Sequence, residues 1–158
     1  WYFELAFGDL LDRHRDQLKD TVVWNIEAGR ALTGPQLGAA ERLRTALDER
    51  CRKFQEQFPF LVLPVCQVVP FPIDQPYVTQ INDVALDTYL DWMKSCYHIS
   101  VTGLPAVSVP AGFTPDGLPV GLQVVGRPGD ELGVLQLAHA IEQATGTSLR
   151  RPVLEYSS

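Results

Sequence analysis

The sequence predicts an α/β fold in which helices flank part of a large mixed β-sheet. Apolar residues recur every three or four positions in residues 1–58, 83–97 and 130–145, which is the spacing of helices with one buried face. Between these segments, residues 60–66 and 105–126 contain short apolar runs bounded by turn signals, which are typical of strands. Strands that alternate with long helices favour a layered α/β architecture.

Local signals place the ends of two helices. Thr33 is expected to cap the start of a long helix, and Gln36 to return the bond as in a capping box. Pro35 is compatible with this start, because a first helical turn does not need its missing N–H. Asp130 is expected to cap the last helix, and Gly146 to end it.

The strands are predicted from three segments. The continuous apolar run 60–65 predicts a strand buried on both faces. Residues 106–110 and 120–125 flank the turn signal 115–117, so we expect an antiparallel hairpin with a rather long loop. The prolines in the stretch 70–76 predict an irregular connection after the first strand.

Charge and composition exclude several classes of function. The 158 residues are 46% hydrophobic and 20% charged, the balance of a globular protein, and their number predicts one domain. Nineteen acidic residues against thirteen basic ones give a net charge of −6, which disfavours nucleic acid and anionic membranes as partners. A transmembrane helix needs about 20 apolar residues in succession, and the sequence has no such run.

The three cysteines, Cys51, Cys66 and Cys96, are too few and too widely spaced for a disulfide framework or a zinc site. This pattern, together with the absence of a signal peptide at the start of the sequence, predicts a cytoplasmic protein. The first residues, from Trp1, resemble the interior of a helix, so we expect the chain to begin inside a longer protein.

The residues do not form a complete catalytic or metal-binding set. No serine lies in a G-x-S-x-G elbow, and Ser108, between two valines of a predicted strand, is expected to be a packing residue. Neighbouring residues of a helix point in different directions, which argues against a thiol–imidazole or metal cluster in the remaining groups. These groups are Cys96 with His98, Asp12 with His14 and Asp16, and His139.

Two further patterns are expected to be structural. Asp87, Asp91 and Lys94 are spaced for ordinary ion pairs on a helix surface. Gly117, Gly121 and Gly126 match neither the dinucleotide-binding nor the phosphate-loop spacing, so turns and close strand packing explain them. No metal or cofactor is predicted.

Two adjoining stretches resemble a known family. Residues 102–113 read TGLPAVSVPAGF, and residues 116–127 read DGLPVGLQVVGR. Together they resemble the C-terminal signature of the amidase signature family. The likeness continues upstream through EAGRALT at 27–33, the following helix with Arg44, and the strand segment at 58–64, where Pro59 replaces the usual aspartate. In all it covers roughly residues 20–145. The signature positions are Gly103, Pro105, Pro110, Gly112, Gly117, Gly121 and Gln123.

The resemblance implies hydrolysis of a carboxylic amide by a serine nucleophile, a second serine and a lysine. In the family these residues belong to a Gly/Ser-rich segment and a preceding lysine in the N-terminal half, and this sequence has no such segment. We therefore assign no catalytic residue here. The resemblance implies that residues 1–158 are the C-terminal segment of an amidase signature domain, incomplete and inactive without the N-terminal half of the same chain. It leaves a homo-oligomer open.

The resemblance also suggests a substrate pocket. Its helix before the Gly103 turn faces the substrate cavity, and Leu90, Met93 and Tyr97 occupy that face here. The glutamine-handling branch has an acidic residue where this sequence has Met93, and a thioether cannot hold an ammonium group. We therefore expect a small-molecule amide that is uncharged and apolar or aromatic. Simple core packing of this stripe is an equally good interpretation.

Two alternatives to a hydrolase remain. One is a non-catalytic domain that binds a partner or ligand on an amidase-derived scaffold. The abrupt apolar start at Phe3 and Phe7 disfavours it. The other is one chain of a two-chain amidotransferase, whose glutamine-handling form is weakened by Met93.

Overall fold

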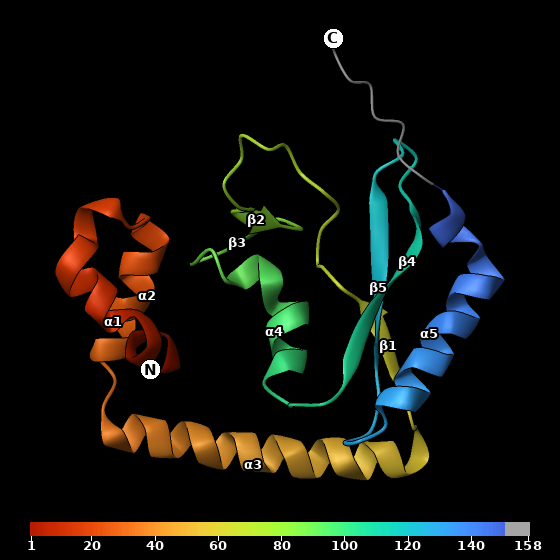
Figure 1. Ribbon diagram of the computed structural model, residues 1–158, viewed down its shortest axis with the longest axis horizontal. Coiled ribbons are helices and arrows are strands. Elements are labelled where there is room, and N and C mark those ends of the chain that lie inside the picture. Colours follow the sequence, from red (N-terminus) through yellow and green to blue (C-terminus); the bar gives the residue numbers. More distant parts are fainter. Residues whose placement is uncertain (151–158) are drawn as a thin grey trace. The chain divides into compact units, whose positions relative to one another are not determined.

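The computed structural model describes residues 1–150 and divides the chain into two compact units, Trp1–Ala46 and Leu47–Ser158. The length of the chain predicts one domain, so the division is a correction. Each unit has its own buried residues. The α/β class predicted from the sequence is confirmed, since helices and strands are both present (Figure 1). Within residues 1–150, no helix is long and apolar enough to span a bilayer.

The first unit is helical, as predicted. It contains α1 (Tyr2–His14), the short 3-10 helix η1 (Arg15–Gln17), α2 (Asp20–Arg30) and the first half of α3 (Gly34–Gln57). The buried residues Leu11 and Ile26 hold α1 against α2. At the start of α3, the Gln36 side-chain carbonyl accepts a hydrogen bond from the Thr33 backbone N–H at 2.8 Å, which is the returning half of the predicted capping box.

An arginine clamp joins α2 to α1. Arg30 donates two hydrogen bonds to the carboxylate of Asp12, at 2.9 and 2.8 Å, and a further one to the carbonyl oxygen of Gly8 at 3.1 Å. The paired guanidinium lowers the pKa of Asp12. Gly29 lies where α2 passes close to α1, because a Cβ at this position would come within 2.6 Å of Glu4 Cβ.

The second unit is built on a three-stranded antiparallel sheet. Its strands are β1 (Leu61–Pro64), β4 (Ala106–Phe113) and β5 (Pro119–Val125), with β5 in the centre. The predicted hairpin of β4 and β5 is confirmed, and its turn uses Gly117 at φ 84°. A bulge between Pro110 and Gly112 interrupts the pairing.

The expected burial of β1 is wrong. Three of its four residues are exposed, and only Leu63 is half-buried. The physical reason is its place in the sheet: β1 lies at an edge and pairs antiparallel with β5, so a row of its backbone groups and the side chains of Leu61 and Val62 remain open. A continuous apolar run therefore does not distinguish a central strand from an edge strand.

Helix α5 (Glu131–Thr145) covers one face of the hairpin (Figure 1). The apolar core on this side contains Val109, Val124, Val134 and Ala138. Both predicted ends of the helix are confirmed. Asp130 accepts a hydrogen bond from the Gly133 N–H at 3.1 Å, and Gly146 ends the helix at φ 62°, before η3 (Thr147–Leu149).

The predicted helix over residues 83–97 is mostly wrong. Residues 80–85 form a small hairpin of β2 (Gln80–Ile81) and β3 (Val84–Ala85), because Asn82 and Asp83 both adopt positive φ in a two-residue turn. Helical structure begins only at η2 (Asp91–Met93), which leads into α4 (Lys94–Ser100).

The delayed start has a local cause. The Asp91 carboxylate accepts hydrogen bonds from the Thr88 backbone N–H at 2.7 Å and from its hydroxyl at 2.9 Å. This bonding resembles a capping box, with threonine before the helix and an acidic residue three positions later. The periodicity continues through the turn and conceals this cap.

Candidate functional site

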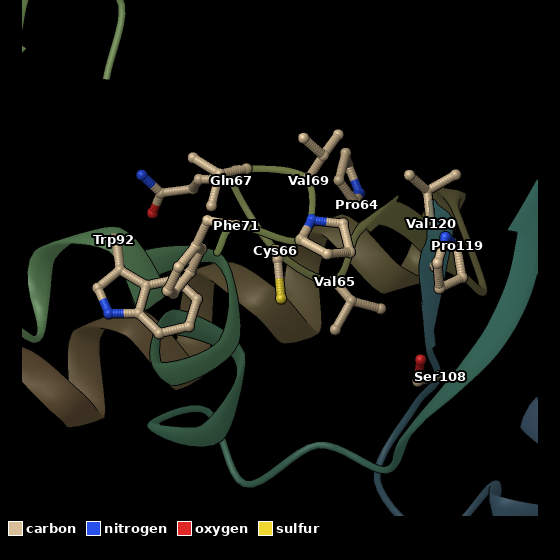
Figure 2. A pocket seen from close by; sticks show the side chains of 13 residues that line it. Pro64, Val65, Cys66, Gln67, Val69, Phe71, Trp92, Ser108, Pro119 and Val120 are labelled. Atoms are coloured by element: carbon tan, nitrogen blue, oxygen red, sulfur yellow. The ribbon is translucent and has the colours of Figure 1, made fainter. Parts of the chain in front are cut away.

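A cavity of about 560 Å³ lies in the second unit, beside the end of β1. Figure 2 shows its walls. The loop from Pro64 to Phe71 forms one wall, Trp92 comes from η2, Ser108 from β4, and residues 119–121 from the start of β5.

A buried amide positions the loop wall. The side chain of Gln123 on β5 is almost fully buried, and its Nε2 donates to the carbonyl oxygens of Pro64 at 3.1 Å and Ser95 at 2.9 Å. The Ser95 hydroxyl in turn donates to the carbonyl of Val65 at 2.6 Å. These bonds fasten the loop after β1 and the helix α4 to the same central strand.

The sheet register brings the polar positions to one face. Ser108 lies directly opposite Gln123 across β4 and β5, and directly opposed residues point to the same side. Gly121, two positions earlier on β5, shares that face. A Cβ at Gly121 would lie 3.2 Å from Val65 Cγ2 and 3.3 Å from Ser108 Oγ, so glycine permits this close approach of strand and loop.

The cavity is predominantly apolar. Phe71 and Trp92 meet edge to face, with ring centroids 5.4 Å apart and planes at 89°. Among the described residues that line the cavity there is no aspartate, glutamate, lysine, arginine or histidine. Such walls suit an uncharged ligand group, since a charged group would lose its hydration without gaining a partner.

The cavity does not contain a recognisable activated nucleophile. Ser108 and Cys66 both line it, but neither has a basic side chain among the described lining residues. Burial raises the pKa of the Cys66 thiol, which is opposite to the activation of a nucleophile. These walls can therefore bind and orient a ligand, but they do not supply the groups for hydrolysis.

The predicted pocket residues lie next to this cavity but not among the residues that line it. Leu90 precedes η2, Met93 ends it, and Tyr97 on α4 is 37% exposed with its ring edge-on to His98. Trp92 lines the cavity instead, although no sequence pattern singled it out. Because residues 86–90 are not helical, the helical spacing that grouped Leu90 with its partners does not hold there.

The signature positions hold the backbone around the cavity. Gly103 and Gly117 adopt positive φ, at 67° and 84°, in the connections before β4 and after it. The carbonyl oxygen of Pro105 accepts a hydrogen bond from the Gly126 N–H at 2.9 Å. The other groups considered as sites remain structural: Asp12 pairs with Arg30, and Asp91 with Lys94 at 2.8 Å. Residues 1–150 contain no cluster of three or more metal-ligating side chains.

Comparison with known proteins gives the family. The model of the amidase family matches residues 7–135. The chain belongs to the amidase family. Solved structures agree with this membership and with the fold. A bacterial aryl acylamidase of the amidase signature family superposes with a TM-score of 0.77 at 28% identity, over 91% of this chain and 31% of that one. A second amidase structure gives a TM-score of 0.80 at 26% identity, over 90% of this chain and 32% of that one.

Curated relatives of this amidase segment include two kinds of protein. A glutamyl-tRNA(Gln) amidotransferase subunit of Thermodesulfovibrio yellowstonii is 38% identical over 115 residues, which are 73% of this chain and 22% of the relative. A fatty acid amide hydrolase of Medicago truncatula is 53% identical over 75 residues, 48% of this chain and 12% of the relative. The chain thus spans about a fifth or less of the length of these curated relatives.

Proposed function

We propose that this chain is the C-terminal part of an amide hydrolase and that it forms a wall of the substrate pocket. The reaction is hydrolysis of a carboxylic amide to an acid and ammonia or an amine. The nucleophilic serine, the second serine and the lysine of the mechanism belong to an N-terminal half outside residues 1–158. The observation that carries the proposal is the family match over residues 7–135, which includes the elements around the cavity.

The walls of the cavity suggest the class of substrate. An apolar or aromatic group of an uncharged amide fits between Phe71, Trp92 and the valines of the loop, because its burial there requires no counter-ion. The names of two relatives point the same way: one is an aryl acylamidase and the other a fatty acid amide hydrolase. Met93, one residue from Trp92, is kept as a second specificity position of the pocket.

A role within an amidotransferase is the second candidate. Seven of the curated relatives carry the name of a glutamyl-tRNA(Gln) amidotransferase subunit. A glutamine-handling site needs a carboxylate for the substrate ammonium, and the described lining residues do not include one. We therefore favour the hydrolase.

The test uses the protein produced from its complete gene. Its rate of hydrolysis is measured with an anilide of an aromatic acid, a long-chain fatty acid amide and glutamine. We expect kcat/KM to be highest for one of the two apolar amides and lowest for glutamine. A protein that hydrolyses glutamine best would support the amidotransferase, and one that hydrolyses none of the three would support a binding module.

A further inference from the structure

Two cysteines that are distant in sequence meet beside the cavity. Cys66 lies on the loop after β1 and Cys96 on α4. The Cys96 thiol donates to the carbonyl oxygen of Val65 at 2.9 Å. This carbonyl belongs to the peptide bond that joins Val65 to Cys66, so covalent geometry puts its oxygen about 3 Å from the Cα of Cys66. Cys96 Sγ therefore lies within about 6 Å of that Cα, inside the range in which disulfides form.

The two thiols also interact with each other. The pKa of Cys66 is raised mainly by burial, and in addition by the charge of the Cys96 thiol and by a hydrogen bond with it. Both cysteines are free, and the Cys66 side chain is exposed on the cavity wall (Figure 2). A reagent that enters the cavity can therefore reach Cys66 first, while Cys96 waits beside it.

The surrounding bonds keep this pair together. Ser95, the neighbour of Cys96, donates to the same Val65 carbonyl at 2.6 Å, and Gln123 holds the carbonyl of Ser95. The loop and the helix are thus already fastened where a disulfide would join them. Cys51 has a different location. It lines a separate apolar cavity of about 260 Å³ with Phe54 and Ile99, and Cys66 is not among the described residues around it.

We propose that Cys66 and Cys96 are a redox-active dithiol that a small-molecule disulfide, such as oxidised glutathione, converts into an intramolecular disulfide on the cavity wall. The Cys66 thiolate attacks one sulfur of the reagent, forming a mixed disulfide and releasing one reduced thiol. Cys96 then gives up its proton and attacks the Cys66 sulfur, and the second reduced thiol leaves. The two protein thiols lose two electrons and two protons in total, and the reagent gains them.

The reaction changes the wall of the cavity. Cys96 no longer has a proton to donate to Val65, and Cys66 is tied to α4 instead of being free to move with the loop. Because Cys66 lines the cavity, the disulfide is expected to alter ligand binding there. This consequence rests on the proposed function. The formation of the disulfide does not, so the two are tested separately.

The test is peptide mapping by mass spectrometry of the complete protein after incubation with oxidised glutathione. We expect a linked pair of peptides containing Cys66 and Cys96, with a mass lower by two hydrogens, which disappears with reduced dithiothreitol. The raised pKa of Cys66 predicts faster formation as the pH is increased from about 7 to about 9. Cys51→Ser is the matched control and should form the same linkage.

Two variants separate the steps. Cys96→Ser should stop at a glutathione adduct on Cys66, because the second thiol is missing. Cys66→Ser should form neither the linkage nor this adduct. Circular dichroism checks that each variant folds, and Cys96→Ala replaces Cys96→Ser if that variant does not. The proposal is overturned if the wild-type protein keeps both thiols at the higher pH, or if Cys66 pairs with Cys51 instead.

Discussion

The side-chain amide of Gln123 donates to the backbone carbonyl of Ser95 at 2.9 Å, across the space between the central strand and α4. The same nitrogen also donates to the carbonyl of Pro64 at 3.1 Å. One buried side chain thus satisfies acceptors on both segments that carry the cavity wall. A buried acceptor without a partner costs free energy, so these bonds fix where the loop and the helix lie.

Replacing Gln123 with leucine should therefore destabilise the protein. The change leaves the Pro64 and Ser95 carbonyls without this donor, and we expect a loss of about 1–3 kcal/mol in the free energy of unfolding. Urea denaturation of the complete protein measures it. Gln136→Leu is the matched control, because Gln136 lies exposed on α5 and should change stability by less than about 0.5 kcal/mol. Equal effects of the two variants would contradict the role of Gln123.

The sequence predicts much of this arrangement, but not its central bonds. Gln123 and the glycines are identified by the resemblance, and the hairpin and both ends of α5 follow from turn and cap residues. The start of α4 is missed, because the Thr88–Asp91 cap lies inside a stretch whose apolar spacing still looks helical. Local patterns also do not reveal which segments meet in space, so Trp92 and the Cys66–Cys96 pair are found only in the structure.

Gly29 permits the close approach of α1 and α2. Gly29→Ala would place a Cβ 2.6 Å from Glu4 Cβ, and one of the two helices would have to move. We expect a loss of about 1–3 kcal/mol in the free energy of unfolding, as for overpacking. Gly38→Ala on α3 is the control: the nearest atom to its new Cβ is Arg42 Nη1 at 3.7 Å, so the helix should gain up to about 1 kcal/mol. A stabilised Gly29→Ala protein would refute the close packing.

The Thr88–Asp91 cap should be lost in acid. Hydrogen bonds from Lys94 and Thr88 lower the pKa of Asp91 from its ordinary value of 3.8 to about 2. A carboxylate with a lowered pKa in the folded state stabilises the protein above its ordinary pKa, and this contribution disappears as the pH falls through the folded value. We therefore expect the loss between about pH 4 and about pH 2. NMR titration of the Asp91 carboxyl carbon measures it, and a midpoint near 3.8 in the folded protein would show that the cap does not hold the charge.

Trp92 should contribute to the binding of an apolar substrate. Its indole forms part of the cavity wall and packs edge-on against Phe71, so Trp92→Ala removes a large apolar contact surface. We expect kcat/KM of the complete enzyme for its best apolar amide to fall by at least about tenfold, mainly through a higher KM, since the contact holds the substrate and not the reacting atoms. Trp24→Ala is the matched control, because Trp24 lies on α2 in the first unit.

Met93 tests the specificity of the same wall. Met93→Asp introduces a carboxylate beside Trp92 and should shift selectivity from apolar amides toward amides that carry an ammonium group, because the new charge can pair with it. The readout is the ratio of kcat/KM for the two kinds of amide, and the control is Asp87→Asn, which removes a charge from an exposed position before the Thr88 cap. If Met93→Asp leaves this ratio unchanged while Trp92→Ala lowers activity, the cavity binds substrate through Trp92 and Met93 is a packing residue.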